Sequence, residues 1–352
     1  MKKILLVDDA LTGHHRVYLK NIVNNIDEQF VIALPENDDD VYVKYNNVDF
    51  RHKKFGLLEY TKYLKRIAKI AKEENVDIIH FLSGDSFFRY FGLFLKSRRD
   101  VRVVITFHKI SEDWLHLKSF KCICKHVTTA VVHSTYLQTL SEQQKLNNVT
   151  TIFYPSFCPK MDKKVAREKL SIPNDKVIIG AIGGTRKSKN LGLLLEALRK
   201  VSGQFHLVIA GKPEEYDSLY IEEHTREYAK SVTVFLRELT DDEYATVVNA
   251  CDIIAIPYSG TFNGASGPLC DGVYTDSFII GSEHGNIGDT IRKNHLGYTF
   301  KTDDSDSLAS VVDKAITIPF ERDEKYFEFQ KKLAPKNFAI GYKQIYENSD
   351  KF

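Results

Sequence analysis

Two glycine-bearing segments carry residue types that could hold a phosphate group. Residues 259–271 read SGTFNGASGPLCD and follow the apolar run 253–257. Glycines let the backbone approach a ligand closely, and a proline at a helix start leaves the free N–H groups there to attract an anion. We therefore predict a strand-to-helix turn in which Ser266 and Gly267 face a phosphate; an ordinary turn is the alternative.

The second segment, residues 183–190, reads GGTRKSKN and lies between the apolar run 177–182 and leucines at one-face helical spacing. Arginine offers phosphate oxygens a planar fork of donors, and lysine offers a point charge. We predict that Arg186 and Lys189 act with Gly183 and Gly184 on one diphosphate. The alternative is a solvated basic turn.

These segments, in this order, resemble the donor half of GT-B glycosyltransferases. GG-x-R-x-x-K-N, VIAGKP at 208–213 and SGPLCDG together are similar to the retaining family four, which transfers sugars from nucleotide donors. That family usually has glutamates where this chain has Asn263 and Asp271. The resemblance implies that Asn263 lies near the donor sugar, that Asp271 binds the donor ribose, and that Arg186 and Lys189 are catalytic.

The first half carries polar residues after its predicted strands. Residues 101–107 form an apolar run that ends at His108, and carboxyl ends of strands are where open α/β sheets hold ligands. The resemblance implies that His108 contacts the transferring sugar and that Gly13, His14 and His15 face the acceptor. Capping, structural or solvated histidines are the alternatives.

Alternation of apolar strands with helical patterns predicts an α/β protein with two doubly wound, Rossmann-like domains. We place an N-terminal acceptor-side domain at 1–158 and a C-terminal nucleotide-sugar domain at 159–325, with a proline-bearing linker at 155–175. The resemblance implies that the helical segment 326–352 packs back onto the first domain. The second domain's strands are predicted at 177–182, 205–210, 232–236, 253–256, 277–281 and 297–300.

Composition argues against several classes of protein. A net charge of +2 does not favour general nucleic-acid binding, and no apolar run approaches the roughly 20 residues of a membrane span. Five cysteines, without a recognisable secretory leader, favour reduced thiols in a cytoplasm. Cys122 and Cys124 are predicted to pack, and the acids at 8–9, 38–40 and 303–304 to serve turns and caps rather than a metal.

The resemblance thus implies a retaining hexosyltransferase that moves a sugar from a nucleoside diphosphate sugar to a hydroxyl acceptor without metal or cofactor. A glycan, lipid-linked or protein-linked acceptor fits, as in bacterial surface polysaccharide synthesis. Basic clusters at 53–54, 62–72 and 96–102 are most simply solvated helix faces, and the alternative is weak association with the inner face of a membrane. An inactive GT-B partner subunit and a nucleotide-sugar epimerase or hydrolase remain alternatives.

Overall fold

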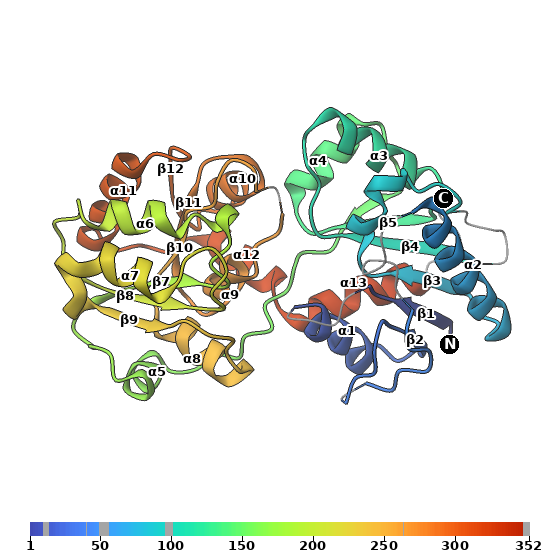
Figure 1. Cartoon of the computed structure of the whole chain (residues 1–352), viewed down its shortest axis with the longest axis horizontal. Helices are drawn as coiled ribbons and strands as arrows, with labels where there is room; N and C mark the ends of the chain where they lie inside the picture. Colours follow the sequence, from blue (N-terminus) through green and yellow to red (C-terminus); the bar gives the residue numbers. More distant parts are fainter. Residues whose placement is uncertain (10–13, 40, 49–55, 96–100, 263, 348–352) are drawn as a thin grey trace. The chain divides into compact units, whose positions relative to one another are not determined.

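The computed structural model divides the chain into two compact units. Unit 1 comprises Met1–Phe153 and Pro335–Phe352, and unit 2 comprises Tyr154–Ala334. The structure describes residues 1–9, 14–39, 41–48, 56–95, 101–262 and 264–347. Each unit is a parallel sheet with helices on its two faces (Figure 1).

Unit 1 has a six-stranded parallel sheet in the order β2-β1-β3-β4-β5-β6. Its strands are short and almost entirely buried, because helices cover both faces of a parallel sheet. Each polar residue that follows such a strand is therefore delivered to the same edge. The strands are β1 (Lys3–Val7), β2 (Gln29–Ala33), β3 (Ile78–Phe81), β4 (Arg102–Phe107), β5 (Thr129–Val132) and β6 (Val149–Thr151).

Two helical layers enclose this sheet. On one face, Tyr60 and Ile67 of α2 join Phe120 and Ile123 of α3 in a single apolar core with the strands. On the other face α1 packs against α13, which carries the chain's last described residues back beside its first helix (Figure 1). The helices are α1 (His14–Asn25), α2 (Leu57–Glu73), the 3-10 helix η1 (Gly84–Tyr90), α3 (Trp114–Cys124), α4 (Thr135–Gln143) and α13 (Pro335–Glu347).

Unit 2 has a second six-stranded parallel sheet, in the order β12-β11-β10-β7-β8-β9. Strands β7 and β10 are central neighbours in this order, so the turns that follow them lie at one edge. The strands are β7 (Val177–Ile182), β8 (Phe205–Ala210), β9 (Val232–Phe235), β10 (Ile253–Ile256), β11 (Phe278–Ser282) and β12 (Gly297–Phe300).

The helices of unit 2 follow its strands in turn. Leucines of α6 and α11 enter one core with β7, β8 and β10. The helices are α5 (Lys163–Leu170), η2 (Lys187–Lys189), α6 (Leu191–Leu198), α7 (Ser218–Thr225), η3 (Arg226–Ser231), α8 (Asp241–Ala250), α9 (Gly267–Tyr274), α10 (Gly285–Lys293), α11 (Ser305–Thr317) and α12 (Glu324–Lys332). Two doubly wound α/β sheets are therefore confirmed.

Two predicted boundaries differ from the structure. The predicted linker contains α5, which Asp162 caps and which Arg167 ties to Asp252 at 2.5 Å, so its polar residues make a docked helix. The single closing segment is two helices: α12 remains in unit 2 against α9, and α13 begins at Pro335 in unit 1. Proline has no N–H and cannot continue a helix, which explains the break.

Candidate functional site

The turn after β7 depends on glycine at Gly183. Its φ is +108°, and a Cβ there would lie 2.2 Å from the Nζ of Lys189. Gly211, after β8, has a φ of +145°, and a Cβ would meet the carbonyl oxygen of Gly183 at 2.3 Å. Only glycine accepts these two conformations at this proximity. The two turns therefore lie backbone against backbone, with the Lys189 ammonium beside Gly183.

Thr185 joins the same two turns through its side chain. Its Oγ accepts from the backbone N–H of Glu214 at 2.8 Å and donates to the carbonyl of Tyr216 at 3.1 Å. Its own N–H donates to the carbonyl of Lys212 at 3.0 Å. Because Thr185 is buried, these bonds are shielded from water and hold the 183–186 backbone in place.

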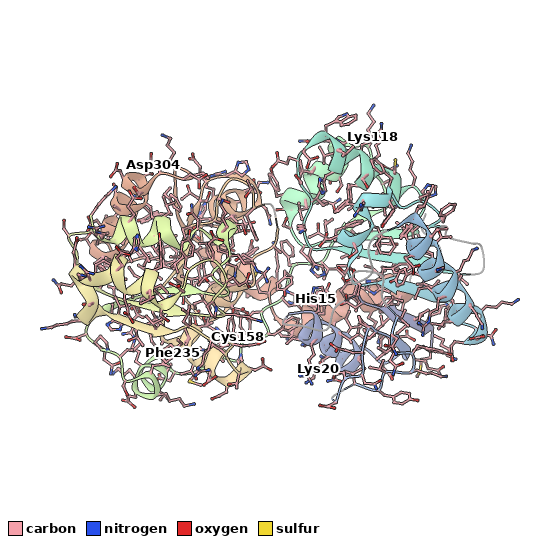
Figure 2. The ribbon with its side chains drawn as sticks, viewed as in Figure 1. His15, Lys20, Lys118, Cys158, Phe235 and Asp304 are labelled. Carbon is pink, nitrogen blue, oxygen red and sulfur yellow. The ribbon has the colours of Figure 1, made fainter. Side chains whose placement is uncertain are left out.

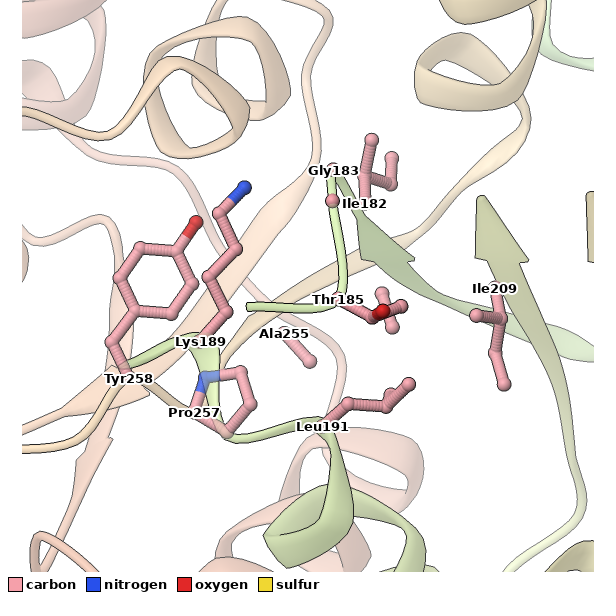
Figure 3. Close-up of a pocket in the computed structure, with 11 residues that line it drawn as sticks. Ile182, Gly183, Thr185, Lys189, Leu191, Ile209, Ala255, Pro257 and Tyr258 are labelled. Atoms are coloured by element: carbon pink, nitrogen blue, oxygen red, sulfur yellow. The ribbon is translucent and has the colours of Figure 1, made fainter. Parts of the chain in front are cut away.

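A pocket opens beside this turn at the edge of the sheet. Gly183, Gly184 and Thr185 line one part of it, and Tyr258 and Pro257, after β10, line another. Lys189 extends along the Tyr258 ring, with its Nζ 5.7 Å from the ring centre (Figure 3). Within the described residues no acidic side chain pairs with Lys189, so its charge is available to an anion in the pocket.

Arg186 has a different environment, although it is only three residues from Lys189. Its Nε donates to the Glu214 carboxylate at 3.1 Å, and its side chain is 66% exposed. The pairing offsets one of the three positive charges that this turn carries on Arg186, Lys187 and Lys189. Of the two predicted phosphate-binding cations, the structure brings only Lys189 into the pocket lining.

The turn after β10 leads into α9, as predicted. Ser266 caps the helix by accepting from the N–H of Leu269 at 3.3 Å, and its Oγ also lies 3.3 Å from the hydroxyl of Tyr258. Gly267 is the first helical residue, and Pro268 follows it. Tyr258 thus links this helix start to the pocket that contains Lys189.

Asp271 lies in α9 and is buried. Its Oδ1 accepts from the Ser156 hydroxyl and its Oδ2 from the Tyr244 hydroxyl, each at 2.7 Å. Burial raises the pKa of this carboxyl from 3.8 to about 6, and the donated hydrogen bonds of Tyr244 and Ser156 oppose that rise. A Cβ on Gly267 would lie 3.9 Å from Oδ2, so the carboxylate faces the start of its own helix.

The histidines of unit 1 gather at the carboxyl edge of its sheet. His15, labelled in Figure 2, donates from Nδ1 to the buried carboxylate of Asp8 at 3.0 Å. His108, after β4, donates from Nε2 to the carbonyl of Leu82 at 2.8 Å, because a carbonyl only accepts. The His108 ring lies 5.9 Å from that of His15 and 5.0 Å from that of His133. The prediction that Asp8 serves only a turn is therefore wrong: it orients His15.

A buried chain of hydrogen bonds continues from this cluster to α13. His133 Nδ1 donates to the carbonyl of Ile152, which leaves Nε2 of the neutral ring to accept from Tyr18. The remaining bonds can then all run in one direction, and burial lowers the pKa of His80 to about 3, which keeps that ring neutral. The successive distances are Tyr346–His80 2.7 Å, His80–Thr106 2.9 Å, Thr106–Tyr342 2.7 Å and Tyr342–Tyr18 2.5 Å.

The predicted residues divide between the two units. Gly183, Gly184 and Lys189 line one pocket of unit 2, Ser266, Gly267 and Asp271 belong to the neighbouring helix start, and Arg186 turns toward Glu214. His15 and His108 lie together in unit 1. Gly13 and Asn263 lie outside the described residues, as does the side chain of His14.

Sequence reasoning missed the residues that support these groups. Glu214, Ser156 and Tyr244 reach the site from turns and a helix distant in sequence, and no motif marks them. Thr185 stood inside the GGTRKSKN segment, between two glycines and a cation. The presence of a hydroxyl side chain at this position was the one sequence signal for its supporting role.

The described residues form neither a membrane-spanning helix nor a cluster of metal ligands. Of the helices in that part of the chain, none combines the length and apolar character needed to cross a bilayer. Nor do three or more histidine, cysteine, aspartate or glutamate side chains come together there as a set that could hold a metal ion. All five cysteines are free thiols.

A family model for glycosyl transferases group 1 matches residues 162–333, which is nearly all of unit 2. The D-inositol 3-phosphate glycosyltransferase of Stackebrandtia nassauensis is 24% identical over 169 residues. That match spans 44% of this chain and only 37% of the relative, so it covers well under half of that protein.

Solved structures resemble the whole chain. Sucrose-phosphate synthase from Thermosynechococcus elongatus has a TM-score of 0.76 at 14% identity, with 98% of each chain covered. HepE from Anabaena, in complex with UDP and glucose, has a TM-score of 0.72 at 14% identity, over 98% of this chain and 99% of that one. At such identities the likeness concerns the fold. The chain therefore has the GT-B fold, and its second unit matches the model of the group 1 family of glycosyltransferases.

Proposed function

We propose that this protein is a glycosyltransferase that moves a sugar from a nucleoside diphosphate sugar to a hydroxyl group. The observation that carries the proposal is Lys189, whose ammonium group lies beside Gly183 in a pocket of unit 2 without an acidic partner among the described residues. A lysine in such a position offers a point charge to phosphate oxygens. The Anabaena relative, solved with UDP and glucose, supports a diphosphate as the occupant.

In this proposal the donor diphosphate lies between the two turns of unit 2. Gly183 and Gly184 allow it to approach the backbone, and Lys189 meets its charge from the side of Tyr258. The free N–H groups at the start of α9, near Ser266 and Gly267, add the positive end of a helix dipole. Asp271 faces that helix start, and we assign the ribose hydroxyls to its carboxylate, which already accepts from Ser156 and Tyr244.

The reaction breaks the bond between the anomeric carbon and the donor phosphate oxygen and forms a new bond from that carbon to the acceptor oxygen. We infer that the acceptor attacks from the side of the leaving group, so the anomeric configuration is retained. The acceptor proton passes to the departing phosphate. Lys189, Arg186 and the helix end stabilise the negative charge that develops on the diphosphate, which is electrostatic catalysis by preorganised groups.

Unit 1 provides the remaining groups of the proposal. His108, held by its bond to Leu82, contacts the transferring sugar, and His15, oriented by Asp8, faces the acceptor. Hydroxyl acceptors on a glycan or on a lipid-linked sugar both suit a surface polysaccharide pathway. A hexose as the transferred sugar and independence from metal ions complete the proposal.

The test is a thermal-shift screen of nucleoside diphosphate sugars, followed by transfer assays with the donors that bind. A donor at about 100 times its dissociation constant should add roughly 2.7 kcal/mol of stability. Proton NMR of the new linkage should show the donor's anomeric configuration, and a chelator should leave the rate unchanged. Donor binding without transfer to any hydroxyl acceptor would instead favour an inactive partner subunit, and an inverted product would refute the mechanism.

A further inference from the structure

Helix α3 of unit 1 exposes large apolar side chains at its start. Trp114, the chain's one tryptophan, is 71% exposed, and the adjacent Leu115 is 52% exposed. The same helix buries Phe120 and Ile123 in the core of unit 1, so these two residues form its inward, packed face. More than half of the surface of each of these two consecutive apolar residues lies in solvent, which indicates a surface that contacts something else.

Lysines follow Trp114 along the same face of the helix. Lys118, Lys121 and Lys125 are spaced at helical intervals from Trp114, and Lys118 lies with its Nζ 5.0 Å from the centre of the indole ring. Figure 2 shows Lys118 projecting away from the ribbon. In the part of the chain that the structure describes, none of the three lysines has an acidic partner.

The acidic groups near this face are already engaged. Asp113 caps α3 by accepting from the N–H of His116 at 3.0 Å, and it also accepts from the Ser111 hydroxyl at 2.6 Å. Glu112 accepts from the Tyr136 hydroxyl. Lys118 lies over the Trp114 ring, and Lys121 and Lys125 lie toward the other end of the helix, so the face combines aromatic and aliphatic groups with positive charge that has no acidic partner among the described residues.

A second exposed apolar pair lies on the segment that packs against α3. In residues 91–95, Leu93 and Phe94 are exposed, and Phe94 is 59% exposed. Gly92 lies so close to Ile123 of α3 that an added Cβ would meet its Cγ1 at 2.8 Å. The segment therefore belongs to the same helical layer as Trp114.

The backbone of this segment is strained as well as exposed. Phe91 has a φ of +54° and Phe94 a φ of +65°, a left-handed conformation that is costly for residues with bulky side chains. Phe94 therefore lowers the stability of the free protein in two ways, through its left-handed backbone and through its apolar ring in solvent. Strain combined with exposure indicates that the segment has a role in function and not only in folding.

We propose that this face of unit 1, defined by Trp114, Leu115, Lys118, Lys121, Lys125 and the 91–95 segment, binds the surface of a bilayer that contains anionic phospholipids. Apolar side chains enter the interface while the lysines meet the lipid phosphates, as in interfacial amphipathic helices. Tryptophan favours this zone because its ring is apolar and its N–H is polar. The inference extends the proposed function toward a lipid-linked acceptor, and its test uses no transfer activity.

This surface differs from the one that the basic runs of the sequence predicted. In α2, Lys62 pairs with Glu59 at 2.8 Å and Lys69 with Glu73 at 3.6 Å, so two of its charges are locally balanced. The lysines of α3 have no such balance among the described residues. The predicted basic runs at 53–54 and 96–100 lie outside the described residues. The α3 face is the one that joins its lysines to the exposed tryptophan, and we therefore place the contact there.

Because Trp114 is the one tryptophan, its fluorescence reports this face directly. The full-length protein is titrated with vesicles of phosphatidylcholine alone and of phosphatidylcholine with phosphatidylglycerol. Binding to the anionic vesicles should shift the emission to shorter wavelength, brominated lipids should quench it, and added salt should weaken binding by screening the lysines. Replacing Lys118, Lys121 and Lys125 by glutamine should lower the affinity about 100-fold, at roughly fivefold for each lysine.

Matched controls are available in unit 2. Lys164, Lys169 and Lys230 are exposed lysines without an acidic partner among the described residues, and their glutamine variant should bind like the wild type. Leu219 is 75% exposed, and Leu219→Ser should also have no effect, whereas Leu115→Ser should weaken binding. Circular dichroism checks that each variant is folded.

Three outcomes would overturn the proposal. The first is the absence of brominated-lipid quenching in the wild type, which needs no variant. The second is equal vesicle affinity in the α3 lysine variant and in its control. The third is a tryptophan shift that depends on protein concentration without lipid, because a second copy of the chain would then cover the face. Failure of the donor screen alone would leave the vesicle result unaffected.

Discussion

The two strand-to-helix turns of unit 2 share sequence features but differ in where their charges go. After β7, Lys189 keeps an ammonium group in a pocket lining without an acidic partner in the described chain. After β10, the carboxylate of Asp271 is buried, and both of its oxygens accept hydrogen bonds from Tyr244 and Ser156. One turn presents its charge to a ligand, while the other first stabilises its charge within the protein.

The difference shows what each charge costs the fold. A lysine on a flexible stem keeps its charge hydrated until a ligand arrives, so the first turn needs no hydrogen-bond partner for that charge within the protein. A carboxylate in an apolar setting needs hydrogen-bond donors to stabilise its charged form, because burial favours the neutral form. The second turn therefore depends on residues far away in sequence, and its function should be sensitive to pH while that of the first is not.

The largest effect should follow from removing the buried charge. Asp271 has a folded-state pKa of about 6, above its unfolded value, so the folded chain holds a proton that the unfolded chain loses near pH 4. The contribution of Asp271 to stability should therefore be greatest below about pH 4 and fall until about pH 6, by up to about 3 kcal/mol. Asp271→Asn should flatten this fall, as measured by urea unfolding at successive pH values.

Asp276, on the same unit but exposed, provides the control for that change. Asp276→Asn should leave the pH dependence of stability as in the wild type, because the carboxylate of Asp276 pairs at the surface with Lys160. If Asp271→Asn leaves the pH profile unchanged, Asp271 is not the buried titrating group, and the contrast between the turns disappears.

Removal of the cation in the first turn should have the next largest effect, on binding rather than on stability. Lys189→Ala should weaken binding of the best nucleoside diphosphate by about 2 kcal/mol, roughly 30-fold, because a charge-assisted bond to phosphate is lost. Isothermal titration calorimetry measures this. Lys187→Ala, an exposed neighbour outside the pocket lining, is the control and should bind as the wild type does.

The order of elements could be predicted from sequence because it depends on local patterns. Strands β7, β8, β10 and β12 have the predicted bounds, since buried parallel strands read as short apolar runs between turn residues. The helix start at Ser266 and Gly267 also follows from local chemistry, because serine caps and glycine with proline begins α9. These features need no knowledge of distant residues.

Partner choice among side chains could not be predicted in this way. Arg186 and Lys189 look equivalent in GGTRKSKN, and only the fold brings Glu214 from the turn after β8 to one of them. Asp8 reads as a turn acid until α1 places His15 against it. The helical pattern across 326–346 hides a break because aromatic spacing continues through it, although Pro335 marks the point. Long-range pairing, rather than propensity, decides each case.

The smallest predicted effect concerns Arg186, and it sharpens the contrast inside a single turn. The Arg186–Glu214 ion pair is exposed, and such pairs contribute about 0 to 1 kcal/mol. Because Glu214 already neutralises Arg186, Arg186→Ala should weaken diphosphate binding less than about fivefold, and Glu214→Gln should strengthen it by a similar factor by freeing the guanidinium. In the Arg186→Ala background, Glu214→Gln should have little further effect if Glu214 acts through Arg186, so the double-mutant cycle measures their coupling. Calorimetry on the four proteins gives the answer. Loss of affinity in Arg186→Ala equal to that in Lys189→Ala would mean that Arg186 leaves Glu214 for the phosphate, and the two cations would then be equivalent after all.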